Sequence, residues 1–287
     1  MNILSIQSEV VYGHVGQGAA RPALQYLGHE VWAIPTVILS GHAGRKAVTG
    51  EPVSAELMAR LLDGVSRSGW LAHCDAVLSG YLGSAEQAAV VAAAVRAVRK
   101  ANPRALYCLD PVFGDEGRAY AKRGVAEAMA TQLLPLADIV TPNAFELASL
   151  ASMPVREPAE ARVAAGRLAR PLVLATSVRD GARIGTLAVT AERAVYASTP
   201  CLDDVPHGAG DLLAALFLAQ RLEGADLAAA LAGSVGPVYA LLRQSCSNEA
   251  DEMPLVTARN LLKAPQPAEL EVREFYPPCG EVSELFT

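Results

Sequence analysis

The sequence predicts an α/β fold: a single domain with a mostly parallel, doubly wound sheet flanked by helices. Short apolar segments alternate with helical patterns over most of the 287 residues, as parallel strands and their crossover helices require. The hydrophobic content of 52% is enough for one large core. No linker, low-complexity segment or internal repeat interrupts this order. We therefore expect one domain over residues 1–287, with an irregular C-terminal tail from about residue 265.

Apolar runs bounded by turn residues predict the buried strands of this sheet. They lie at residues 2–7, 30–39, 74–79, 105–109, 138–140 and 172–176. Residues 183–190 and 193–199 alternate in polarity and lie close together in the chain, which predicts a pair of strands at the sheet edge. The polar, Gly-rich segment 40–52 predicts either a flap or a small β excursion.

Helices are expected between the strands, and several carry recognisable start or stop signals. Gly13, Gly16 and Gly18 mark a loop that opens the first helix and Gly28 ends that helix, while Ser54 and Asn143 are expected to cap later helices. Further helical patterns cover residues 84–100, 157–170 and 225–243, a stretch from about residue 125, and the apolar run that follows residue 208.

The composition excludes several classes of function. The net charge is −6 and only 5% of residues are aromatic, so we expect no nucleic-acid partner. The five cysteines are scattered and form no CxxC, which argues against a disulfide framework and favours a reducing cytoplasm. The N-terminus lacks the pattern of a signal peptide and the Ala-rich stretches contain charges, so we expect no membrane partner.

The most informative stretch is Pro206–Asp211, which reads PHGAGD and precedes an apolar helical run. The turn Gly208-Ala209-Gly210 would direct backbone N–H groups and a helix N-terminus at one point, which favours an anion such as phosphate. Asp211 at that mouth suits a base that takes a proton from an attacking hydroxyl. Read alone, the same residues also fit an ordinary loop with an Asp at the start of a core helix.

Polar residues elsewhere follow the expected strands, and ligands of such sheets bind outside the carboxyl ends of the strands. Asp110 follows one strand, and Asn143 and Glu146 follow the next. Their oxygens could hold Mg²⁺ directly or through water. Read singly, Asp110 also fits a turn residue before proline, and Glu146 a first-turn helix acid. The polar signals that we expect at one edge are Ser8, the 40–44 loop, Tyr81, Asp110, Asn143, Glu146, Thr176 and the GAGD turn.

Five segments carry a family resemblance: SIQSEVVYGHVGQGAA, CDAVLSGYLGSAEQ, DPVFGDEG, TPNAFELASL and GAGDLLAALF. They resemble the pyridoxal kinase branch of the ribokinase-like kinases, over nearly the whole chain to about residue 245. The resemblance implies a ribokinase-like fold, a homodimer, ATP as co-substrate, Mg²⁺ and often a monovalent cation such as K⁺. It also implies phosphorylation of the 5′-hydroxymethyl group of pyridoxal or a related B6 vitamer.

The resemblance also implies roles for individual residues. Asp211 matches the catalytic base, and the neighbouring anion hole matches Gly208, Ala209 and Gly210. Asp110 and Glu146 match acidic positions near the ATP phosphates and the magnesium ion. The residues that match contacts to the pyridine ring are Ser8, Val15, His42 and Tyr81. Those that match the nucleotide side are Thr141, Thr176, Thr199, Pro200, Cys201 and Leu202.

Three departures from the family pattern keep other functions open. The flap at residues 40–46 has Ala43 where a hydroxyl is expected, Gln17 replaces an asparagine, and Thr176 replaces a lysine near ATP. One alternative is a kinase for another hydroxymethyl heterocycle, such as a hydroxymethylpyrimidine, or for a sugar. Another is a vitamer-binding protein with little catalytic activity.

Overall fold

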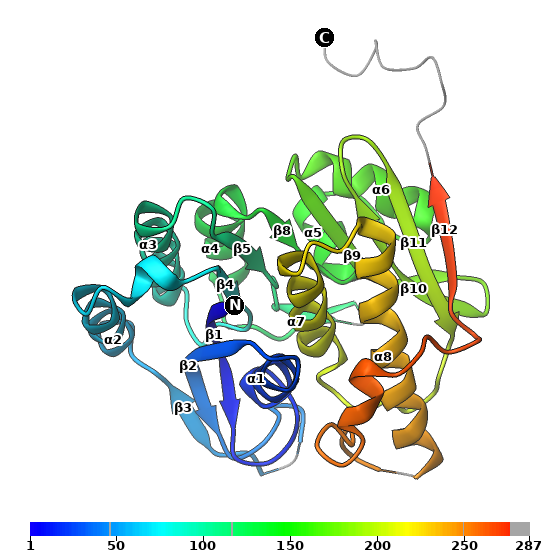
Figure 1. Ribbon diagram of the computed structural model, residues 1–287, viewed down its shortest axis with the longest axis horizontal. Coiled ribbons are helices and arrows are strands. Elements are labelled where there is room, and N and C mark those ends of the chain that lie inside the picture. The colour runs from blue at the N-terminus through cyan, green and yellow to red at the C-terminus, as the bar shows by residue number, and fades with distance from the viewer. Residues whose placement is uncertain (46, 116, 249, 276–287) are drawn as a thin grey trace.

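The computed structural model describes residues 1–45, 47–115, 117–248 and 250–275. Within them, a ten-stranded sheet has the order β12-β11-β10-β9-β8-β5-β4-β1-β2-β3 (Figure 1). Its strands are β1 (Asn2–Val10), β2 (Glu30–Leu39), β3 (Gly50–Pro52), β4 (Ala76–Ser79), β5 (Leu106–Leu109), β8 (Ile139–Val140), β9 (Leu172–Asp180), β10 (Arg183–Val189), β11 (Ala194–Pro200) and β12 (Glu271–Phe275). A separate hairpin joins β6 (Gly114–Asp115) to β7 (Arg118–Ala119).

The central strands from β2 to β9 pair in parallel, which confirms the predicted sheet. Chain order reverses at β1, because β2 pairs on one side of it and β4 on the other. That reversal makes the sheet doubly wound and opens a crevice at the carboxyl ends of the strands. The strands from β9 to β12 are antiparallel, as is the short β3 against β2.

Helices cover both faces of the sheet because neighbouring strand residues point in opposite directions. Ile3 belongs to a core with α1, α7 and α8, whereas Leu4 belongs to a core with α2, α3 and α4. Cys108 and Tyr107 on β5 divide in the same way. The helices are α1 (Gln17–Tyr26), α2 (Ala55–Arg67), α3 (Glu86–Ala101), α4 (Val125–Ala128), α5 (Ala144–Ala151), α6 (Pro158–Arg167), α7 (Ala209–Leu222) and α8 (Leu227–Ser247). None of these helices combines the length and apolarity needed to cross a membrane.

The C-terminal part corrects two predictions. The tail from residue 265 is not irregular throughout, because β12 (Glu271–Phe275) pairs antiparallel with β11. The predicted pair β10 and β11 does form, but β12 takes the edge position. Four of the five residues of β12 are exposed, so its sequence lacks the buried alternation that reveals a strand. The rest of the predicted tail, residues 276–287 with Cys279, lies outside the described residues.

Candidate active site

The backbone pairing of the sheet continues just past the strand ends and fixes the first residues of the loops there. The Asp110 N–H donates to the Ser79 carbonyl at 2.8 Å, and the Thr141 N–H donates to the Leu109 carbonyl at 3.0 Å. Thr176 forms an isolated parallel bridge with Asn143. The polar residues expected after neighbouring strands therefore do come together at one edge of the sheet.

Two aspartates face each other at this edge. Asp110 is buried, and its Oδ1 accepts a hydrogen bond from the Thr141 hydroxyl at 2.7 Å. Burial, and then the charge of Asp211, raise the pKa of Asp110 to about 7. Burial also raises the pKa of Asp211 to about 6, opposed by a hydrogen bond from the Gly16 backbone N–H. The Thr141 hydroxyl, which was expected to lie at the nucleotide, thus holds the Asp110 carboxylate in position.

Glu146 supports the site through backbone hydrogen bonds. Its Oε1 accepts from the N–H groups of Phe113 and Gly114, and its Oε2 accepts from the N–H of Asn143. Asn143 in turn accepts from the Glu146 N–H and donates to the Gly114 carbonyl at 2.7 Å. This capping box begins α5 and ties the loop after Asp110 to it. Burial, and then the charge of Asp110, raise the pKa of Glu146, and the backbone donors oppose that shift.

The GAGD turn forms the start of α7, as the sequence predicts. Gly208 is the residue before the helix and has φ 96°, a left-handed conformation that favours glycine. A Cβ at this position would overlap the carbonyl oxygen of His14, so the turn and the first Gly-rich loop are in close contact. The first-turn N–H groups of α7 have no partner within the helix and face the edge where Asp211 lies. An anion can therefore bind beside a carboxylate.

Three of the residues expected at the substrate ring lie near this turn or near the first loop that contacts it. Ser8 at the end of β1 and Val15 in the first loop are buried. His42 stacks on His207 with ring centroids 3.9 Å apart. Burial, and then the neighbouring His207, lower the pKa of His42 to about 4, so it is neutral at pH 7. Tyr81 is half-buried and its carbonyl accepts from the Thr36 hydroxyl.

Sequence reasoning missed two residues of this wall. His207 precedes the GAGD turn and stacks on His42. Gly16 donates to Asp211 and lies so close to Ser8 that a Cβ would overlap it. The glycines at positions 13, 16 and 18 predict a loop, and the GAGD turn predicts an anion-binding helix start, but the contact between them is a tertiary feature that spacing does not reveal.

An apolar pocket continues from the GAGD turn between the sheet and α8. It includes Thr176, Thr199, Pro200 and Leu202, which were expected on the nucleotide side, together with Ala209 and Gly210. Cys201 does not line it but lies between two residues that do, with its Sγ 3.6 Å from Arg179 Nη1. Helix α8 contributes one wall of this pocket through Val235, Val238 and Tyr239, which the sequence did not predict. A flat apolar group could bind here with attached phosphates at the turn.

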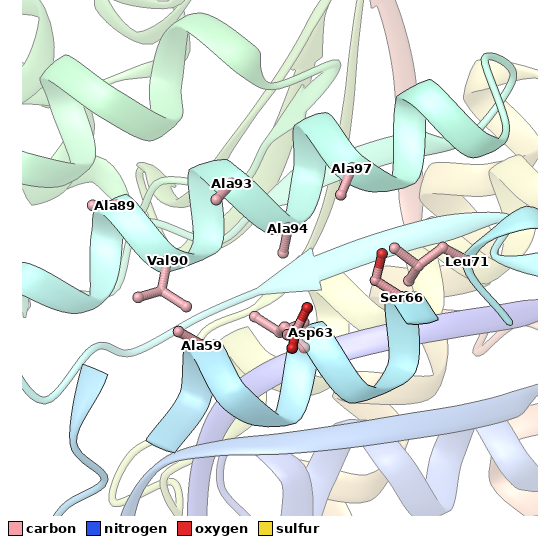
Figure 2. A pocket seen from close by; sticks show the side chains of 10 residues that line it. Ala59, Asp63, Ser66, Leu71, Ala89, Val90, Ala93, Ala94 and Ala97 are labelled. Atoms are coloured by element: carbon pink, nitrogen blue, oxygen red, sulfur yellow. The ribbon is translucent and has the colours of Figure 1, made fainter. Parts of the chain in front are cut away.

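A second hollow lies between α2 and α3, away from this edge (Figure 2). Alanine and valine side chains of α3 form one wall, and α2 contributes Ala59, Asp63 and Ser66. Asp63 is paired with Arg67 on the next helical turn. Because this hollow offers so little chemistry, the carboxylates at the sheet edge define the candidate active site.

A doubly wound sheet with a carboxylate beside a glycine-initiated helix start is the architecture of one class of protein, the ribokinase-like phosphotransferases that act on small molecules. A family model described as phosphomethylpyrimidine kinase matches residues 32–255. Pyridoxal kinase PdxY of Rubrobacter xylanophilus is 45% identical over 95% of this chain and 97% of that protein. Pyridoxal kinase PdxY of Deinococcus radiodurans is 44% identical over 92% and 94%, respectively.

A solved structure agrees with these relatives. Pyridoxal kinase from Leishmania donovani in complex with ADP and pyridoxamine superposes with a TM-score of 0.90 at 28% identity, covering 96% of this chain and 99% of that chain. The chain therefore belongs to the pyridoxal kinase family. This agrees with the resemblance that the sequence motifs carry.

Proposed function

We propose that this chain transfers the γ-phosphoryl group of ATP to the 5′-hydroxymethyl group of a B6 vitamer, giving pyridoxal 5′-phosphate and ADP when the vitamer is pyridoxal. The observation that carries the proposal is the position of Asp211, between the apolar pocket beyond Gly210 and the wall that contains Ser8 and His42. The relatives named pyridoxal kinase, and the Leishmania complex with ADP and pyridoxamine, support the same assignment.

In this proposal Asp211 accepts the proton of the vitamer hydroxyl as its oxygen attacks the γ-phosphorus. The new O–P bond forms while the bond from that phosphorus to the bridging oxygen breaks, and ADP leaves. The N–H groups at Gly208, Ala209 and Gly210 stabilise the charge that develops on the transferring group. Gly16 keeps Asp211 oriented through its backbone N–H.

Mg²⁺ fits the donor set at this edge. Asp110 and Asp211 repel each other, and a divalent cation with carboxylate and water ligands would relieve that repulsion. Glu146 commits its oxygens to backbone donors, so we propose Asp110 as the direct ligand and Glu146 as a contributor through water. The described residues contain no group of three or more His, Cys, Asp or Glu able to hold a metal, so ATP would supply further ligands. Bound there, Mg²⁺ neutralises phosphate charge. A monovalent cation such as K⁺ is proposed from the resemblance alone.

The raised pKa of Asp211 predicts a pH dependence. The base acts only when ionised, so kcat should rise with pH through an acid limb near pH 6 and then level off. Asp110 has the higher pKa and is still largely protonated where Asp211 ionises, so the limb should persist near pH 6 in Asp110→Asn. We would measure kcat between pH 5 and 8 in both proteins, a range that covers the acid limb. ATP and the vitamer titrate as well, but equally in both series, so loss of the limb in Asp110→Asn would contradict the assignment, because Asp110 would then be the titrating base.

A direct comparison of substrates can identify the hydroxyl group that is phosphorylated. The family model described as phosphomethylpyrimidine kinase, and Ala43 in the flap, keep a hydroxymethylpyrimidine as the second candidate. We expect the highest kcat/KM with a B6 vitamer in a panel of pyridoxal, pyridoxine, pyridoxamine, hydroxymethylpyrimidine and a sugar, each with ATP and Mg²⁺. A higher value for the pyrimidine would replace the proposed substrate. Vitamer binding without any phosphorylated product would favour a binding protein.

Two further proposals concern the assembly and the cellular compartment. We propose a homodimer from the resemblance, and the exposed Leu57 and Leu61, one turn apart on α2, are apolar surface that such a contact would bury. Sedimentation equilibrium would measure the mass directly. We also propose that the protein acts in a reducing cytoplasm. The described cysteines, which are all free, support this proposal.

A further inference from the structure

Glu252, in the loop after α8, lies where three distant segments meet. Its Oε1 accepts from Arg45 Nη2 at 2.7 Å, and its Oε2 accepts from the His14 backbone N–H at 2.9 Å. The carboxylate lies directly against Gly13, since a Cβ on that glycine would come within 2.8 Å of Oε1. One carboxylate on the loop after α8 therefore joins the first Gly-rich loop to the flap, defined here as residues 40–45 and 47–49 between β2 and β3.

The arm through Arg45 acts on the flap. The Arg45 backbone N–H donates to the His42 carbonyl at 2.9 Å, and its guanidinium lies 5.2 Å from the centre of the Tyr12 ring. The side chain is thus held by Glu252 while its backbone fixes the turn that carries His42. His42 then stacks on His207 next to the anion-binding turn. Removing Glu252 from Arg45 would release the substrate wall of the site.

The arm through His14 acts on the reacting centre. The His14 N–H binds Glu252, and the His14 carbonyl lies against Gly208. Two residues further on, the Gly16 N–H donates to Asp211. The neighbouring Met253 is fully buried and also packs on Gly208. Glu252 therefore holds in place the short loop that contacts both the turn and the base.

We infer that Glu252 is a positioning residue for phosphoryl transfer, bridging Arg45 of the flap and the His14 N–H of the first loop. The inference rests on the proposed function and adds a residue to it. The bridge needs two acceptor oxygens on one side chain, one for each donor. A glutamine has a single acceptor oxygen, and its NH₂ group would face either Arg45 or the His14 N–H.

The test compares Glu252→Gln with Asp251→Asn. Asp251 is a matched control because it is the adjacent acid and loses the same charge. Its exposed side chain lies 3.6 Å from Arg45 Nη1, and its backbone carbonyl, which accepts from Arg45 Nη2 at 3.3 Å, is unchanged by the substitution. Glu252→Gln should lower kcat/KM for the vitamer by about tenfold to hundredfold, as expected for a lost hydrogen bond to a charged group. KM for ATP should stay within about twofold, and Asp251→Asn should resemble the wild type throughout. Arg45→Met removes the flap arm alone, so it should raise the vitamer KM more than it lowers kcat.

A second readout is independent of the reaction. Trypsin should cleave the ligand-free protein at Arg45 faster in Glu252→Gln than in Asp251→Asn, because the flap is no longer tied down. Equal cleavage and equal vitamer kinetics in the two variants would overturn the inference. A parallel rise in the KM for ATP would also overturn it, because it would indicate general damage. If the wild type phosphorylates no vitamer, the proposed function fails, and the cleavage rates alone still decide the bridge.

Discussion

Asp211→Asn is expected to lower kcat by about 10²- to 10⁴-fold, the range in which a positioned base contributes to proton transfer. The amide keeps the size of the side chain and can still accept the Gly16 N–H, but it cannot take the proton of the attacking hydroxyl. ATP binding should survive, because the apolar pocket and the first-turn N–H groups of α7 are unchanged. Initial rates of phosphorylated vitamer and calorimetric titration with ATP measure the two effects separately.

Asp203→Asn supplies the control for the charge change. Asp203 is exposed in the loop that leads to the same turn, and Cys246 contacts its backbone carbonyl, not its side chain. It should keep the kcat of the wild type. If Asp211→Asn retained a kcat close to that of Asp203→Asn, Asp211 would not be the base.

Gly208→Ala is expected to cost both stability and activity. The φ of 96° costs a residue with a Cβ about 1–2 kcal/mol, and the added carbon would also press on the His14 carbonyl, which is backbone and has little freedom to move. The turn must therefore shift relative to the first loop. Because displacements of about 1 Å at a reacting centre can cost about 10²-fold, we expect kcat to fall by that order. Urea unfolding and kcat are the measurements.

Gly224→Ala separates backbone strain from the clash. Gly224 follows α7 with φ 83°, but a Cβ there would meet nothing within 4 Å. It should lose a similar free energy of unfolding from the backbone alone, with unchanged kcat. Equal kcat values in the two variants would show that the contact between Gly208 and His14 does not matter for the reaction.

Much of the fold follows from local patterns. The apolar runs that became β1, β4 and β5 are short and continuous, as strands buried on both faces must be. Asn143 was expected to cap α5 with Glu146 in its first turn, and the structure shows that the two residues form a capping box there. The positions of polar residues after strands were enough to predict that Asp110 and the GAGD turn lie at one edge, because the topology brings these strand ends together.

The remaining features depend on contacts that no local pattern encodes. Strand β12 forms by pairing with the free edge of β11, and its own residues are mostly exposed. Thr141 was assigned to the nucleotide side through the resemblance, and Glu146 to Mg²⁺ through its place after a strand and the resemblance, and the hydrogen bonds that they make to Asp110 and to backbone N–H groups were not predicted. Glu252 lies 238 positions from His14, so nothing in the sequence joins them.

The central claim is that the γ-phosphoryl group of ATP reaches the 5′-hydroxyl of a B6 vitamer at this site. The most direct measurement follows ATP labelled with ³²P at the γ position, incubated with pyridoxal, Mg²⁺ and the protein, and quantifies ADP and labelled pyridoxal 5′-phosphate together. We predict equal amounts of the two products in the wild type and almost none in Asp211→Asn. ADP formed with label only in inorganic phosphate, or pyridoxal bound with no labelled product, would contradict the claim.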